Sequence, residues 1–209
     1  VRTYYAKSSG SPYSESTYNT MGQLVARRDP DGVTELHTYN PDGTRDRTVL
    51  DMNGNGVMNE TDGNPNAPDD RISYSVRDVV PAASSGKTPP VDLVRIRTYV
   101  FANDDTTDKV LISVKETSTD GRRSWSTVYR DGSTPVTTYS EVGTVSSGIR
   151  TDKVVNPDLT SVEQVYTHGR LTTVREKDSA GTQVSSVTYS YDPHGRLASQ
   201  TDARNGATS

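Results

Sequence analysis

Tyr191-Asp-Pro-His-Gly195-Arg-Leu197, near the end of the chain, has a close copy near its start, Tyr18-Asn-Thr-Met-Gly22-Gln-Leu24. Stretches that recur at intervals of a few tens of residues are the sequence signature of repeat architectures. Three eroded copies lie between: Tyr39-Asn-Pro-Asp-Gly43, which lacks the leucine, and the shortened Tyr129-Arg-Asp-Gly132 and Tyr166-Thr-His-Gly169-Arg-Leu171. The chain is therefore predicted to be an array of degenerate repeats built on Tyr-x-x-x-Gly-x-Leu.

The interval between copies has the length of a β-hairpin unit. Tyr18 and Tyr39 are 21 residues apart (39 − 18) and Tyr166 and Tyr191 are 25 apart (191 − 166). Two strands of about 5–6 residues and two turns fill such an interval. In Asn-Pro-Asp-Gly and Asp-Pro-His-Gly, proline suits the second position of a type I turn, and glycine suits the positive-φ position that closes the hairpin with a bulge. A second glycine-ending turn follows each return strand, at residues 29–32, 177–181 and 202–206.

The segments between the turns alternate with a period of two. Val187, Tyr189 and Tyr191 alternate with Thr188 and Ser190, which is typical of a strand with one apolar and one polar face. Only 30% of the residues are hydrophobic, and there are 12 tyrosines, 16 glycines and 11 prolines, so a thick core is not expected. We predict an all-β fold, an array of antiparallel β-hairpin repeats forming an extended or coiled sheet, with very little helix.

Charge and composition exclude several partners. The net charge is −4 with acidic and basic residues interspersed, so there is no basic stripe for nucleic acid. No apolar run approaches the roughly 18 residues of a membrane span. The chain has no cysteine, which excludes disulfides and thiolate sites. It starts at Val1 without an initiator methionine or a signal peptide, and we interpret it as a processed product or an excised piece.

Three segments organise the chain. Residues 1–80 hold the first hairpins with an inserted loop at 51–62, residues 81–92 form a Pro/Ser/Gly-rich loop, and residues 93–209 hold further hairpins, expected to continue the same sheet. Residues 103–108 are predicted to be an exposed loop. Unpaired sheet edges bind other strands, so we expect neighbouring repeats or identical subunits as partners, and more protein after the last copy.

At this point the residues resemble a known family. Tyr191-Asp-Pro-His-Gly195-Arg-Leu197, followed by Thr201-Asp202 and Gly206, resembles the YD repeat of Rhs-type proteins, and the resemblance extends in degenerate form over residues 13–50 and 116–206. It implies β-hairpin sheets that coil into hollow shells around toxins, or cell-surface and adhesion modules as in wall-associated proteins and teneurins. The implied location is secreted or cell-surface. The family's shell-closing segment with its aspartate self-cleavage site has no counterpart here, so neither autoproteolysis nor a toxin domain is implied.

The inserted loop has the spacing of a calcium loop. It supplies oxygen ligands at positions 1, 3, 5, 7, 9 and 12 and a glycine at position 6; the ligand positions are Asp51, Asn53, Asn55, Val57 through its carbonyl, Asn59 and Asp62. We predict a structural Ca²⁺ that stiffens a loop without apolar anchors, similar to dockerin-type extracellular loops. The other interpretation is a metal-free turn, because Asn-Gly pairs and aspartates also serve turns.

No catalytic signature is present, and we predict that the protein is not an enzyme. His168 and His194 both precede a turn glycine and His37 stands alone, with no nucleophile and orienting acid set beside any of them. A carboxylate pair of the glycosidase type stays open, because separation in space is not readable from sequence. The main alternative to a structural role is a carbohydrate- or protein-binding adhesion module that presents aromatic rings on a sheet face; its candidates are Tyr4, Tyr5, Tyr13, Tyr99, Trp125 and Tyr139.

Overall fold

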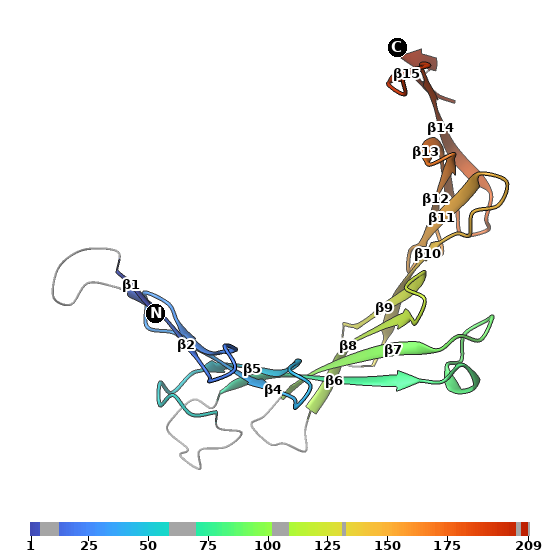
Figure 1. Cartoon of the computed structure of the whole chain (residues 1–209). Helices are drawn as coiled ribbons and strands as arrows, with labels where there is room; N and C mark the ends of the chain where they lie inside the picture. Colours follow the sequence, from blue (N-terminus) through green and yellow to red (C-terminus); the bar gives the residue numbers. More distant parts are fainter. Residues whose placement is uncertain (5–12, 59–69, 102–108, 131–132, 204–205, 209) are drawn as a thin grey trace. The chain divides into compact units, whose positions relative to one another are not determined.

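The computed structural model describes residues 1–4, 13–58, 70–101, 109–130, 133–203 and 206–208 (Figure 1). Within these ranges the chain consists of β-strands, with one 3-10 turn at Ala82–Ser84 as its helical element. No described helix is long and apolar enough to cross a membrane. The predicted all-β fold with very little helix is confirmed. The loop predicted at residues 103–108 lies outside the described residues.

Sixteen strands make up the described sheet, and they are hydrogen-bonded in the order in which they follow one another along the chain. Every described register is antiparallel, so the predicted array of hairpins is confirmed. The strands are β1 (Arg2–Tyr4), β2 (Tyr13–Tyr18), β3 (Leu24–Arg28), β4 (Thr34–Tyr39), β5 (Arg45–Asp51), β6 (Arg71–Val80), β7 (Leu93–Phe101), β8 (Lys109–Ser118), β9 (Arg123–Tyr129), β10 (Pro135–Val142), β11 (Ile149–Val155), β12 (Ser161–Thr167), β13 (Arg170–Lys177), β14 (Gln183–Tyr191), β15 (Leu197–Asp202) and β16 (Gly206–Thr208).

The signature turns have the predicted geometry. Asn19 N donates to Gln23 O over 2.9 Å and Gly22 N donates to Asn19 O over 3.0 Å. Gly22 has a φ of +78°, which a residue without Cβ adopts at no steric cost. The ladder shifts its register at Tyr18, as a bulge requires. The turn at residues 192–196 repeats both hydrogen bonds, so the best-preserved copies close their hairpins in the same way.

The tyrosine and the leucine of the signature lie opposite each other on paired strands. This holds for three copies, Tyr18 with Leu24, Tyr166 with Leu171 and Tyr191 with Leu197, whereas Tyr39 faces Arg45 in the copy that lacks the leucine. Directly opposed side chains are the unit of sheet stabilisation. The spacing of the signature thus places its tyrosine and its leucine opposite each other, as one cross-strand pair on the two sides of a single turn.

The shortened copy at residues 166–171 uses a different turn. His168 and Gly169 have φ values of +50° and +82°, and two successive positive values define a two-residue type I′ turn. The bulge keeps its place directly after the leucine: Thr172 is skipped between Leu171 and Thr173, as Val25 is skipped between Leu24 and Ala26. Losing one turn residue therefore changes the turn type without moving the bulge or separating the tyrosine from its leucine.

Two compact units are formed, residues 1–77 with 96–113 and residues 78–95 with 114–209. Each has a small apolar core among its described residues. Val49 and Ile72 are buried in the first unit, and Val80 and Leu93 are buried in the second.

Most other apolar side chains stay half-exposed. In the second unit Val128, Val142 and Val154, on β9, β10 and β11, keep 41–45% of their surface exposed. The sequence predicted strands with one apolar and one polar face, and such alternation does not specify what packs on either face. Among the described residues of the unit, no second layer covers these valines.

Cationic side chains cover the aromatic rings instead. Their aliphatic stems shield ring carbon from water while the charged group lies over the ring face. The described pairs, with distances from the cation to the ring centroid, are Arg28 on Tyr13 (5.1 Å), Arg45 on Tyr39 (5.8 Å), Arg47 on Tyr74 (5.2 Å), Lys109 on Tyr74 and Tyr99 (5.5 and 5.1 Å), Lys87 on Trp125 (4.6 Å), Arg150 on Tyr166 (4.4 Å) and Arg170 on Tyr191 (5.6 Å).

Opposite charges form a row across five strands of the second unit. Arg123, Glu141, Lys153, Glu163 and Arg175 lie directly opposite one another in turn, on β9 to β13. Each opposed pair of unlike charges stabilises a sheet by roughly 0.2–1 kcal/mol, and like charges there destabilise it. A slip of one residue would break every pair, so the row favours a single register.

Candidate functional site

The signature tyrosine also reaches the preceding repeat. Tyr39 Oη donates to the carbonyl of Leu24 over 2.7 Å, and Tyr191 Oη donates to the carbonyl of Leu171 over 2.8 Å. Leu24 and Leu171 are the leucines of the copies that precede Tyr39 and Tyr191. A net contribution of about 1 kcal/mol is typical of such a bond. We call this contact the tyrosine latch; it connects consecutive repeats in both units.

A second contact between repeats lies over the turn glycines. The residue after the glycine of one copy covers the glycine of the next copy: Gln23 lies over Gly43, and Arg170 lies over Gly195. A Cβ added at Gly195 would come within 2.7 Å of Arg170 Nη2, and one added at Gly43 would lie 3.6 Å from Gln23 Nε2. Both glycines therefore allow a positive φ, and Gly195 also leaves room for the Arg170 side chain of the preceding repeat.

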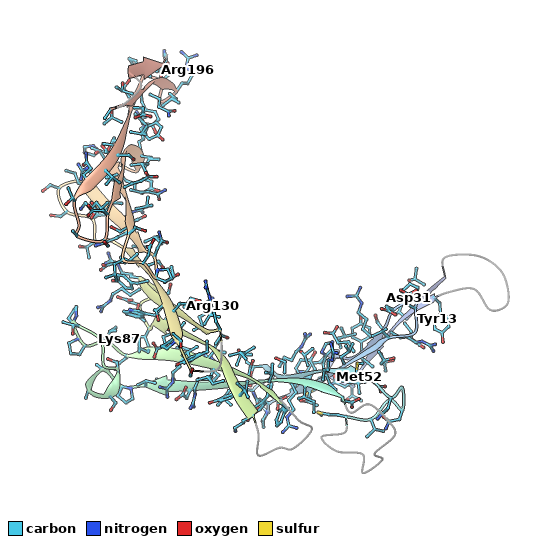
Figure 2. The ribbon with its side chains drawn as sticks, turned by 180° about the vertical axis from the view of Figure 1, so that it is seen from behind. Tyr13, Asp31, Met52, Lys87, Arg130 and Arg196 are labelled. Carbon is cyan, nitrogen blue, oxygen red and sulfur yellow. The ribbon has the colours of Figure 1, made fainter. Side chains whose placement is uncertain are left out.

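The inserted loop is organised around Asp51, at the end of β5 and only 6% exposed. Its Oδ1 accepts from Gly54 N over 2.7 Å and its Oδ2 from Gly56 N over 2.8 Å. Asn53 Oδ1 accepts from Asn55 N over 3.0 Å, which fixes a turn of the Asx type. Met52, labelled in Figure 2, begins the loop. The chain thus curls round one carboxylate.

The predicted calcium ligands divide into two groups. Asp51, Asn53, Asn55 and Val57 belong to the described loop, and Asn55 Oδ1 accepts from Val57 N over 2.7 Å. Asn59 and Asp62 lie outside the described residues. No three His, Cys, Asp or Glu side chains gather as a metal site in the part of the chain that is described. The first ligands are carboxylate and amide oxygens, which fit a hard cation such as Ca²⁺.

Asp70 joins this loop although the sequence reasoning missed it. It lies just before β6, is 3% exposed, and accepts from Met52 N over 3.0 Å. The acidic pair Asp69-Asp70 ahead of a strand was the only signal in the sequence. Its contact with Met52 spans 18 residues, and a contact of that range depends on how β5 and β6 pair.

The predicted aromatic platform is used for packing wherever its side chains are described. Trp125 and Tyr139 are opposed on β9 and β10 with ring centroids 5.2 Å apart. Tyr99 lies 6.3 Å from Tyr74, and Tyr13 Oη accepts from Arg28 over 3.0 Å. Tyr5 and the side chain of Tyr4 lie outside the described residues.

One hollow in the second unit combines both charge signs with an aromatic ring. Its volume is about 320 Å³, and it is lined by Thr88, Pro89, Asp120, Arg122, Arg123, Tyr139, Glu141 and Thr144. Tyr139 Oη donates to Glu141 Oε2 over 2.8 Å. Burial, together with Glu141, raises the pKa of Tyr139 to about 12. The phenol therefore stays protonated and keeps donating at physiological pH.

The 81–92 loop closes one side of this hollow. Lys87, labelled in Figure 2, pairs with Glu116 over 2.5 Å and lies over Trp125. Arg123 Nη1 donates to the carbonyl of Pro89 over 3.3 Å. The predicted connection between β6 and β7 is therefore attached to the sheet by charged side chains.

The histidines serve two different structural roles. His168 belongs to the type I′ turn, and its Nε2 lies where a Cβ on Gly148 would come within 2.7 Å. His37 is 5% exposed, and no described residue forms a hydrogen bond with its Nδ1. Burial and the positive Arg45 lower the pKa of His37, against the opposing effect of Glu35, so the imidazole is neutral at pH 7.

Comparison with known proteins gives one family. Residues 166–207 match the family model described as RHS Repeat. The solved structure titled "Crystal Structure of TcdB2-TccC3-TEV" is similar, with a TM-score of 0.31 and 12% sequence identity. That match covers 92% of this chain and 11% of the other, so this chain spans about a ninth of its length. No curated protein matches the chain.

Proposed function

We propose that this chain, whose residues 166–207 match the RHS Repeat family model, is a structural module of an extracellular shell, fibre or cell-surface scaffold. In this role it is a piece of a larger secreted or surface-attached repeat protein. Its partners are neighbouring repeats or identical subunits, joined through sheet edges.

The tyrosine latch is the observation that supports this proposal most strongly. It recurs in two places with nearly the same length, 2.7 and 2.8 Å, and in each place it joins one copy to the copy before it. Stability in such arrays is the sum of the repeats and their nearest-neighbour contacts. The recurring residues of this chain thus form contacts between successive repeats, as expected of a structural scaffold.

Edge pairing can be tested with a matched pair of variants. Lysine on an edge strand blocks strand addition, so Thr208→Lys in β16 is compared with Thr188→Lys in β14. We expect concentration-dependent association of the wild type by light scattering, with oligomers or filaments by electron microscopy. Thr208→Lys should weaken this association and Thr188→Lys should leave it in place. A strictly monomeric wild type, or equal effects of the two variants, would overturn edge pairing.

Calcium binding by the 51–62 loop is part of the proposed role. Asp51, Asn53 and Asn55 would hold the ion with side-chain oxygens and Val57 with its carbonyl, and Asn59 and Asp62 would complete the set. Binding to the folded loop alone would stabilise it by mass action. Calorimetric titration should show heat, and a chelator should lower the melting temperature of the calcium-loaded protein. No heat and no chelator effect would dispose of the site.

Carbohydrate or protein binding is the second candidate function. The hollow beside Tyr139 favours it, because Arg122 and Glu141 place donors and acceptors round an aromatic ring there. A glycan array is the direct screen, with Tyr139→Phe as the matched variant. A monomer that binds a glycan and loses it with Tyr139→Phe would replace the scaffold proposal, and an array without signal would remove the alternative.

A further inference from the structure

Two consecutive Asn-Gly pairs stand in the loop that follows β5. They are Asn53-Gly54 and Asn55-Gly56. An asparagine that precedes glycine is open to a spontaneous reaction, because a following residue without a side chain leaves the backbone nitrogen accessible. That nitrogen attacks the asparagine Cγ, loses its proton and displaces ammonia, which leaves a five-membered succinimide. Water then opens the ring to aspartate or isoaspartate, so the net change is amide plus water to carboxylic acid plus ammonia.

Both attacking nitrogens are already engaged. Gly54 N donates to Asp51 Oδ1 over 2.7 Å, and Gly56 N donates to Asp51 Oδ2 over 2.8 Å. Each carboxylate oxygen thus holds one of the two nitrogens. Hydrogen bonds to an ionised acceptor are about twice as strong as neutral ones. A nitrogen that lost its proton here would also place a second negative charge against the carboxylate, which is unfavourable at this separation.

The asparagine side chains are held as well. Asn53 Oδ1 accepts from Asn55 N over 3.0 Å and Asn55 Oδ1 accepts from Val57 N over 2.7 Å. Ring closure therefore has to break the bond at the attacking nitrogen, while the bonds to Oδ1 restrain the side chain that carries the electrophilic Cγ. All of these bonds belong to the same loop.

We propose that Asn53 and Asn55 are deamidation sites and that the buried Asp51 carboxylate protects them by occupying the amides of Gly54 and Gly56. The folded loop keeps two neutral amides at positions 53 and 55. When the loop opens, both asparagines are exposed to irreversible conversion into aspartate or isoaspartate. The extent of conversion therefore increases with the time that the loop has spent open. This protection does not require calcium and stands apart from the proposed scaffold role.

Peptide mapping by mass spectrometry tests the proposal on the full chain. The protein is incubated at mildly alkaline pH with a chelator, either folded or in urea, and conversion at residues 53 and 55 is followed with time. Folded wild type should convert on the order of tenfold more slowly than the unfolded chain, the ratio expected from one charge-assisted hydrogen bond. Asn40 and Asn156 precede proline, which has no N–H, and serve as unreactive internal standards.

Two variants distinguish protection of the asparagines by the Asp51 carboxylate from protection by the general rigidity of the folded loop. Asp51→Asn removes the charged acceptor of both glycine amides and should speed conversion of Asn53 and Asn55 roughly tenfold. Asp70→Asn alters an equally buried carboxylate that bonds Met52 N and should change the rate little. Equal acceleration by the two, or none by Asp51→Asn in a folded protein, would overturn the proposal. If Asp51→Asn does not fold, equal rates for wild type with and without urea would do so.

Discussion

The turns at residues 40–44 and 156–160 differ by one residue and make the same hydrogen bonds. Their sequences are Asn-Pro-Asp-Gly-Thr and Asn-Pro-Asp-Leu-Thr. In both turns the first nitrogen donates to the last carbonyl over 2.8 Å, and the fourth nitrogen donates to the first carbonyl over 2.9 Å. In both, the threonine hydroxyl donates to the aspartate, over 2.6 Å in the first and 2.7 Å in the second.

The comparison distinguishes two roles that are usually assigned to glycine together, adopting a positive φ and specifying the turn. Gly43 has a φ of +82° and Leu159 has a φ of +68°, so the left-handed conformation survives without glycine. The flanking asparagine, proline, aspartate and threonine specify the turn, and glycine removes a steric cost of roughly 1–2 kcal/mol. Leu159 is 65% exposed, and its side chain brings little burial to offset that cost.

The largest effect is expected for Gly43→Leu, which copies the second turn into the first. Leucine at positive φ costs roughly 1–2 kcal/mol, and its side chain meets Gln23 Nε2, 3.6 Å from the Cβ position. Thermal denaturation should report a loss of that size. If the variant is as stable as the wild type, the turn does not depend on glycine at all.

Tyr39→Phe tests the latch, which the second turn lacks because Val155 stands in place of the tyrosine. The loss of the bond to Leu24 O should cost about 1 kcal/mol, with the ring still covered by Arg45. Chemical denaturation of Tyr39→Phe and Val155→Ile measures the difference between a latched and an unlatched position. A variant pair with equal, negligible losses would show that the latch does not stabilise the array.

Leu159→Gly is the reverse exchange, and its effect should be smaller than that of Gly43→Leu. Relief of the left-handed strain gains roughly 1–2 kcal/mol, and the greater freedom of glycine in the unfolded chain offsets about 0.5–1 kcal/mol of it. A net stabilisation of about 0.5–1 kcal/mol is expected, visible as slower hydrogen exchange at residues 159 and 160. Faster exchange would mean that the leucine makes a contact worth more than its strain.

The smallest effect should appear in acid. The Thr44 hydroxyl and amide lower the pKa of Asp42, and the Thr160 hydroxyl and amide lower the pKa of Asp158, below the usual 3.8. Because the unfolded pKa is the higher one, each carboxylate contributes stability that is present above about pH 3.8 and lost as the pH falls through the folded value. Melting temperatures at pH 5 and pH 3 should differ less in Asp158→Asn and in Thr160→Val than in the wild type. An unchanged difference would remove the proposed role of these side chains.

The repeat could be predicted from the sequence because its signals lie close together along the chain. Tyrosine, turn residues and glycine lie within seven positions at residues 18–24 and 191–197, so hairpins, bulges and positive φ values could all be predicted. The turn at 156–160 was missed because leucine occupies the glycine position and valine the tyrosine position. Its remaining signal in the sequence is Asn-Pro-Asp at residues 156–158.

Contacts between repeats could not be predicted in the same way. Tyr39 and Leu24 are 15 residues apart and Tyr191 and Leu171 are 20 apart. Only the pairing of β3 with β4 and of β13 with β14 brings each pair together. The candidate calcium loop shows the same division. Its Asx turns follow from local spacing, whereas the approach of Asp70 depends on the pairing of β5 with β6.

The tyrosine latch is open to a direct measurement by carbon-13 NMR of the full chain with labelled leucine carbonyls. A carbonyl that loses a hydrogen bond changes its chemical shift. Tyr39→Phe should move the Leu24 carbonyl and leave Leu171 in place, and Tyr191→Phe should move Leu171 and leave Leu24 in place. Unmoved carbonyls in both variants would contradict the account that consecutive repeats are joined by this bond.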